Sequence, residues 1–239
     1  MDRTVSRFAL AGLASLACLL TGCALLFGKQ VDPDSRMISP DGSKAIWRVV
    51  EVRSPLYVGR VAGNEPPRQL MAVHGPAYWA RDSRHVVVQA ERSGKQSDIL
   101  VFDSERPQQE PLNLTPWSGA RSVVVPGALS ADKVYFASNR RDDAVFDLYA
   151  GDIASGAAEL VFRNPGDVVQ WIADVDGTIG ARVRQQDEQY ILQVMNPSTH
   201  TWRSVYHWTD DNKLTPERID RANGEFLAVA KKVKYQASR

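Results

Sequence analysis

The chain has 239 residues, with 29 basic and 28 acidic side chains, so it carries almost no net charge. This balance excludes a general nucleic-acid binder and a polybasic membrane-surface protein, since both need a concentrated positive footprint. Hydrophobic residues make up 44% and charged residues 24%, which is typical of a folded globular chain. The two cysteines, Cys18 and Cys23, both lie near the N-terminus. The remainder therefore has no disulfide, no thiolate nucleophile and no cysteine-based zinc site.

The N-terminus has the pattern of a secretory signal. Arg3 and Arg7 precede an apolar stretch, and no charged residue occurs from Phe8 to Gly28. This stretch is also long enough for an uncleaved transmembrane helix, which is one alternative. An ordinary secretory signal that happens to contain a cysteine is the other.

Residues 20–23 read Leu-Thr-Gly-Cys and resemble the lipobox of bacterial lipoprotein signals. The resemblance implies cleavage between Gly22 and Cys23, a diacylglycerol on the Cys23 thiol and an acyl chain such as palmitate on the new amine. Several acyl chains anchor a protein firmly to a membrane. Cys18 fits the box poorly, so Cys23 is the predicted lipidation site. Ala24 follows where enteric inner-membrane lipoproteins have Asp, which implies the outer membrane, facing the periplasm.

After the leader the sequence repeats, and three landmarks each occur four times at intervals of 41 to 50 residues. A polar turn recurs around Asp41, Asp82, Asp132 and Asp176. An apolar segment recurs around Tyr57, Leu100, Tyr149 and Leu192. A second apolar segment recurs around Leu70, Leu114, Val161 and Val205. Three landmarks that keep one period predict a repeat architecture.

Each unit is built from short β-rich segments bounded by turn residues. The segment after the polar turn spans 44–51, 85–91, 133–139 and 178–185 in the four units. Several short strands in about 43 residues are typical of a four-stranded propeller blade. The sequence therefore predicts an all-β fold, a partial or small β-propeller of about four four-stranded blades.

The predicted organisation has four parts. A lipoprotein signal peptide occupies 1–22 and a tether 23–35. Propeller blades occupy 36–208, and 209–239 is an incomplete blade or a tail. Within that last part, Thr215 and Pro216 predict a helix start, and the lysines at 231–234 a frayed terminus.

Short motifs in the repeats resemble a known family. Ser-Pro-Asp-Gly at 39–42 resembles an element of TolB-type propellers. Leu-Thr-Pro-Trp at 114–117, Ser-Asn-Arg at 138–140, Asp-Leu-Tyr at 147–149 and Asn-Pro-Gly-Asp-Val at 164–168 then follow. Their order is similar to that in the propeller of prolyl oligopeptidase-type serine peptidases, where the propeller precedes an α/β-hydrolase domain and filters access to it.

The sequence elements that carry catalysis in that family do not occur after these motifs. A hydrolase domain needs a Gly-x-Ser-x-Gly elbow, and this pentapeptide does not occur in the chain. Only 31 residues follow Trp208, which is too short for such a domain. We therefore expect no catalytic residue, no cofactor and no metal site. The resulting hypothesis is a non-catalytic envelope lipoprotein that binds a protein or peptide; the alternative is the truncated propeller portion of a serine peptidase.

A few individual residues have a structural interpretation and a functional one. Asp174–Gly177 resembles part of a calcium loop but lacks the later ligands, so a turn is expected. The tryptophans are expected to pack in the core rather than to line a ligand site. Ser39, Ser83 and Ser130 are expected to stabilise turns through their hydroxyls.

Overall fold

The computed structural model describes residues 35–49, 55–72, 74–92, 95–210 and 214–228, and the backbone of 231–234. The predicted signal peptide, Gly22 and Cys23 lie outside these residues. Within the described part of the chain, no helix is long and apolar enough to cross a membrane.

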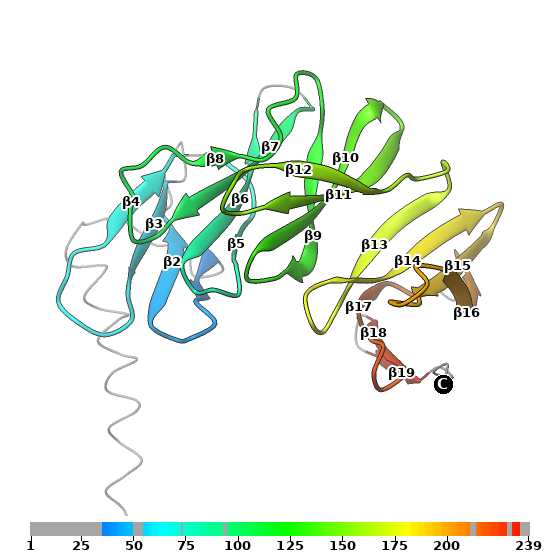
Figure 1. Ribbon diagram of the computed structural model, residues 1–239. Helices are drawn as coiled ribbons and strands as arrows, with labels where there is room; N and C mark the ends of the chain where they lie inside the picture. Colours follow the sequence, from blue (N-terminus) through cyan, green and yellow to red (C-terminus); the bar gives the residue numbers. More distant parts are fainter. Residues whose placement is uncertain are drawn as a thin grey trace, which may run out of the picture.

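The chain forms four successive sheets, each built around a blade of four consecutive antiparallel strands (Figure 1). The first blade contains β1 (Met37–Ile38), β2 (Lys44–Arg48), β3 (Leu56–Arg60) and β4 (Arg68–Met71). The second contains β5 (Ala77–Trp79), β6 (His85–Glu91), β7 (Ser97–Asp103) and β8 (Leu112–Asn113). The third contains β9 (Ser122–Leu129), β10 (Lys133–Asp142), β11 (Val145–Asp152) and β12 (Ala158–Phe162). The fourth contains β13 (Val168–Asp174), β14 (Ile179–Gln186), β15 (Gln189–Met195) and β16 (Trp202–Thr209).

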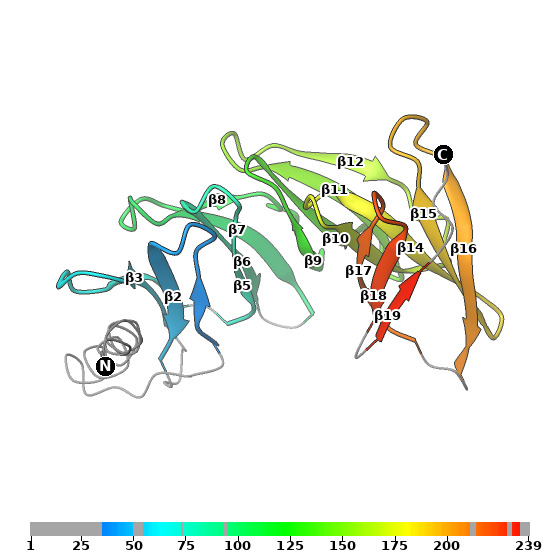
Figure 2. The same ribbon diagram turned by 90° about the horizontal axis from the view of Figure 1, so that it is seen from below.

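The three sequence landmarks occupy equivalent places in every blade. The polar turn joins the first strand to the second, the apolar segment lies on the third strand, and the second apolar segment lies on or directly after the fourth. The segments expected after each polar turn are the second strands, with ends that differ by a few residues from the predicted ones. The predicted all-β propeller fold of four four-stranded blades is confirmed, and the blades follow one another in an arc (Figure 2).

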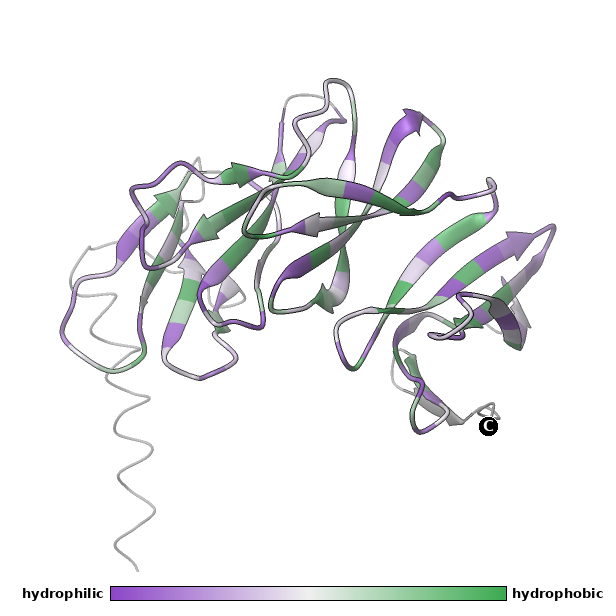
Figure 3. Cartoon of the chain, in the orientation of Figure 1, coloured by the Kyte–Doolittle hydropathy of each residue, from purple (hydrophilic) through white to green (hydrophobic). Residues whose placement is uncertain are grey.

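Neighbouring blades pack face to face through alternating residues of their strands. In β6, Val86 and Val88 lie in a core with the first blade, whereas Val87 lies in a core with Phe136 of the third blade. Successive side chains of a strand point to opposite faces, so a strand covered on both sides must be apolar at successive positions. This explains why β6 and β7 are buried along most of their length and have unbroken apolar runs, at 86–88 and 99–102 (Figure 3).

Three further strands follow the fourth blade: β17 (Pro216–Asp220), β18 (Glu225–Ala228) and β19 (Lys231–Lys234). β17 pairs in parallel with β13, and β18 and β19 add to it in antiparallel order. The fourth sheet therefore has seven strands. Ile219 of β17 and Phe226 of β18 are buried against Ile172 and Leu192 of the fourth blade.

Two expectations for this last segment were wrong. The expected helix start at Thr215 and Pro216 is a strand, because pairing with β13 and burial of Ile219 outweigh the local capping signal. Pro216 is tolerated there as the first residue of its strand, where the missing N–H is least costly. The lysines at 231–234 are not a frayed terminus, since β19 pairs along its length with β18.

Candidate functional site

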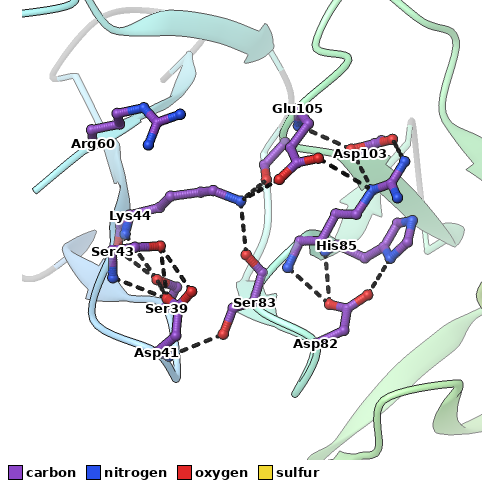
Figure 4. Close-up of polar contacts among 12 residues, drawn as sticks. Ser39, Asp41, Ser43, Lys44, Arg60, Asp82, Ser83, His85, Asp103 and Glu105 are labelled. Atoms are coloured by element: carbon purple, nitrogen blue, oxygen red, sulfur yellow. Dashed lines mark hydrogen bonds and ion pairs between the residues drawn. The ribbon is translucent and has the colours of Figure 1, made fainter.

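The turns between the first and second strands form one face of the arc, and their aspartates are used by the turns themselves. Asp41 Oδ1 accepts hydrogen bonds from Ser39 Oγ at 2.7 Å, Ser43 N at 2.9 Å and Ser43 Oγ at 2.8 Å (Figure 4). The bond from the Ser39 hydroxyl, followed by those from Ser43, lowers the pKa of Asp41 to about 2. The carboxylate is therefore ionised and committed to the turn rather than available as a general base.

The same arrangement recurs in the other blades. Asp82 Oδ1 accepts from the backbone N–H groups of Arg84 and His85, both at 2.9 Å. Asp176 Oδ1 accepts from the Thr178 backbone N–H at 2.8 Å and from its hydroxyl at 2.6 Å. The segment 174–177 is thus the expected turn. The residues that the structure describes contain no group of three or more His, Cys, Asp or Glu side chains placed to hold a metal ion.

Other contacts on this face join one blade to the next. The Asp41 backbone N–H donates to Ser83 Oγ at 3.0 Å, and Lys44 Nζ donates to the Ser83 carbonyl at 3.1 Å and pairs with Glu105 at 3.2 Å (Figure 4). Ser39 and Ser130 stabilise their own turns, as expected, whereas Ser83 bridges two blades. The polar groups of this face are thus largely used in holding the blades together.

The opposite face contains a recess of about 320 Å³ at the second blade and at its connection to the third. It is formed by the connection between β6 and β7, the start of β7, the end of β8 and the connection between β8 and β9. Its lining residues are Arg92, Gln96, Asp98, Asn113, Pro116, Trp117 and Ser118.

The floor of the recess is a buried carboxylate. Asp98 accepts a hydrogen bond from Asn113 Nδ2 at 3.1 Å and pairs with the exposed Arg92. The third blade has an equivalent arrangement, in which Arg141 Nε donates to Asp147 at 2.7 Å and the Asn164 N–H donates to the same carboxylate at 2.8 Å. Since the arrangement is repeated, Asp98 is a structural anchor of the blade rather than a catalytic acid.

The wall of the recess is the indole of Trp117. Its ring centroid lies 4.9 Å from that of Tyr149 and 6.0 Å from that of Phe136, and the guanidinium carbon of Arg140 lies 4.4 Å from the Trp117 ring centroid. A guanidinium this close to an indole is attracted to the ring by a cation–π interaction. Trp117 and Arg140 belong to the motifs at 114–117 and 138–140, which the fold brings together.

The expectation that the tryptophans pack in the core holds for four buried ones, and Trp117 and Trp202 are half-buried and pack against the core from its edge. Buried tryptophans are Trp47, Trp79, Trp171 and Trp208. Trp117 is only half-buried and lines the recess. Sequence reasoning considered a ligand-lining role for the tryptophans but preferred core packing, because the residues that form the recess around Trp117 come from separate segments. The proline before it was the one local signal, since Pro-Trp in a connection favours a turn over a buried strand.

Comparison with known proteins supports the fold. No protein-family model and no curated protein matches the sequence. Among solved structures, TolB from Acinetobacter baumannii aligns with a TM-score of 0.50 and 14% identity over 84% of this chain and 51% of that chain. Acylaminoacyl peptidase from Pyrococcus horikoshii aligns with a TM-score of 0.54 and 14% identity over 81% of this chain and 34% of that chain. An uncharacterized protein of Listeria monocytogenes, lmo1340, aligns with a TM-score of 0.52 and 14% identity over 84% of this chain and 60% of that chain.

The chain thus spans about half the length of that TolB and about a third of that peptidase. At this level of identity the likeness concerns the fold alone. The resemblance to TolB-like propellers and to peptidase propellers is therefore confirmed at the level of the fold.

Proposed function

We propose that this chain is a non-catalytic lipoprotein of the bacterial envelope, held by lipid on Cys23, whose propeller binds a protein or peptide. The observation that carries the proposal is the recess beside Trp117, an open cavity with an aromatic wall. Ligand sites are typically concave, with an apolar or aromatic wall and a few polar groups that fix orientation. The opposite face, whose polar groups are used in turns and blade contacts, is the weaker candidate.

Photo-crosslinking tests this proposal directly. We expect p-benzoylphenylalanine in place of Ser118, an exposed residue that lines the recess, to give an adduct of defined mass with an envelope protein or peptide in cells. Gln108 is the matched control, because it is exposed and lies in the connection between β7 and β8, on the other side of the same blade. Equal adducts from both positions, or none from position 118, would contradict a binding role for the recess.

The alternative function is the propeller portion of a prolyl oligopeptidase-type serine peptidase. The likeness to acylaminoacyl peptidase favours this reading. In that case the chain would be active only with a hydrolase chain, which would supply the nucleophile, its base and the oxyanion donors.

A fluorophosphonate probe separates the two functions, because it reacts covalently with activated serines. We expect no stoichiometric labelling of the purified protein. Ser39 and Ser130 are bonded within their turns, and Ser83 Oγ accepts a backbone hydrogen bond from the neighbouring blade. Stoichiometric labelling of folded protein would overturn the non-catalytic proposal. Peptidase activity that appears only on adding a hydrolase chain encoded downstream would establish the alternative.

A further inference from the structure

We propose that the outer edge of β12 (Ala158–Phe162) binds an extended peptide segment by strand addition. This inference rests on the proposed binding function and names the mode by which the partner is held. β12 is the outermost strand of the third blade and lies on the convex side of the arc (Figure 2). Within the described residues it pairs with β11 alone, so the backbone groups along its other edge are unpaired.

Two aliphatic side chains are exposed on this strand. Leu160 is 46% exposed and Val161 is 36% exposed. The single charged residue of β12, Glu159, pairs with Lys133 of the same blade at 3.4 Å, which balances its charge. The edge thus offers unpaired main-chain groups beside apolar side chains.

Val161 has a different environment from its counterparts in other blades. It is the extra residue of a β-bulge that recurs in the first and fourth blades, at Leu70 and Val205. Leu70 is buried in the core between the first two blades, and Val205 packs against the core of the fourth. The third blade therefore exposes an aliphatic residue that the other two blades use for packing.

The residue before the bulge differs in the same way. It is Gln69 in the first blade, Ser204 in the fourth and Leu160 in the third. A polar side chain suits an exposed position, whereas a leucine gains free energy when a partner covers it. The third blade thus departs from the pattern at two adjacent positions of one edge.

The outermost strands of the other sheets are protected against strand addition. β4 exposes Arg68, and β16 exposes Arg203 and His207. β8 has two residues, and β19 has lysine at three of its four positions. Short length and basic side chains both hinder the pairing of an edge with another chain. β12 has five residues and none of them is basic.

The edge adjoins the wall of the recess. Leu160 lies directly opposite Tyr149 in the pairing of β12 with β11. Residues in such a pair have their side chains on the same face of the sheet, with Cβ atoms about 5 Å apart. The ring of Tyr149 lies 4.9 Å from that of Trp117, which lines the recess. A segment held on β12 is therefore close to the recess.

The shape of this surface favours a peptide over a second copy of the chain. A strand of five residues is about 17 Å long, and two convex surfaces joined there touch along little more than that strand. Such a contact buries far less than the about 1,200 Å² at the lower end for stable protein–protein interfaces. Strand addition instead gains affinity from main-chain hydrogen bonds, which an extended peptide supplies along its whole length.

NMR titration of the isotope-labelled full-length protein tests the inference with two peptides. The probe is the pentapeptide Thr-Val-Thr-Val-Thr with acetylated and amidated ends, which is uncharged and has a high β propensity. Its match carries a methyl group on the amide nitrogen of every residue, so it keeps the side chains and loses the backbone donors. We expect the probe to cause saturable shifts of the backbone N–H signals of residues 158–162, with millimolar affinity. The methylated match should bind about tenfold more weakly, because main-chain hydrogen bonds are lost.

Variants locate the effect. Leu160→Gln gives the third blade the residue type of the first, and it should weaken probe binding about tenfold because less apolar surface is covered. Val161→Lys should weaken binding by at least as much, since it adds the basic protection of the other edges. Leu227→Gln is the matched control, because Leu227 is also 46% exposed but lies on β18, between two strands of its sheet. This control should leave binding unchanged, and the indole signals of the buried tryptophans report that each variant is folded.

Equal binding of the methylated match, or unchanged binding by Leu160→Gln, would overturn the inference. A dimer that forms without peptide and dissociates in Leu160→Gln would assign the edge to a second copy and contradict the peptide assignment. If crosslinks from position 118 persisted in either case, the binding function would stand and strand addition alone would fall. The absence of both crosslinks and probe binding would contradict the binding function as well.

Discussion

Labelled palmitate should be incorporated into the wild-type protein and be absent from the Cys23→Ala variant. The predicted lipobox places the acceptor thiol at Cys23, and no other residue of the box can be alkylated by diacylglycerol. We therefore expect complete loss of the label, retention of residues 1–22 and loss of the mature acylated form. Radiolabelling of cells and mass spectrometry of the N-terminal peptide measure these outcomes. The effect is all-or-none because several acyl chains are lost together.

Cys18→Ala is the matched control, since it removes the other thiol of the same segment. This variant should keep both the label and cleavage between Gly22 and Cys23. Palmitate in Cys23→Ala at the wild-type level would contradict lipidation at this position. An unlabelled wild-type protein that keeps residues 1–22 would instead support the uncleaved transmembrane helix.

Asp147→Ala should lower the free energy of unfolding by about 3 kcal/mol at neutral pH, because it removes the carboxylate of a buried ion pair and leaves the arginine without its partner. Asp147 is fully buried and accepts hydrogen bonds from Arg141 Nε at 2.7 Å, Arg141 Nη2 at 2.8 Å and the Asn164 N–H at 2.8 Å. Truncation leaves the buried Asn164 N–H without this acceptor. The value lies at the lower end for buried pairs because the Arg141 side chain is 34% exposed.

Urea unfolding measures this difference, and Asp143→Ala is the control. Asp143 is exposed, so its truncation removes the same charge and should change the free energy of unfolding by less than about 0.5 kcal/mol. Similar destabilisation by the two variants would show that net charge, rather than the buried pair, is responsible.

The destabilisation should depend on pH. Burial by itself would raise the pKa of Asp147, but hydrogen bonds from Arg141 and Asn164 outweigh it, so the pKa lies below its usual value. A carboxylate whose pKa is lowered on folding stabilises the protein above its unfolded pKa of about 3.9. That contribution is lost as pH falls through the lower folded pKa. The difference between wild type and Asp147→Ala should therefore be constant near neutral pH and shrink below about pH 4; an unchanged difference would contradict this origin.

The blade repeat could be predicted from sequence because its signals are local. The turn at Asp41 needs an acceptor for the N–H and hydroxyl groups of nearby residues, and Ser39 and Ser43 lie two positions away on either side. The same logic holds at Asp176 and Thr178. Such short-range bonds leave a pattern that recurs with each blade, so the order of strands could be predicted without knowledge of how blades pack.

The recess could not be predicted in this way, because its lining comes from three separate segments of the second blade and of the connection that follows it. Trp117 and Arg140 are 23 residues apart and meet only because the connection after β8 lies against the third blade. Composition and spacing favour a tryptophan in the core, and whether one face of the ring stays accessible is decided by the neighbouring strands.

The segment after the fourth blade shows that tertiary contacts can also override a local sequence signal. The local sequence around Thr215 and Pro216 favours a helix start, yet the chain forms β17. β17 pairs with β13, a strand 45 residues earlier in the sequence, through Ala173 with Arg218 and Asp174 with Ile219. This pairing and the burial of Ile219 stabilise the strand over a helix. Local sequence thus determined the turns, the strand order and the repeat, whose bonds span few residues. Tertiary packing decided the last strands and the accessible face of Trp117, because those contacts join residues that are distant in sequence.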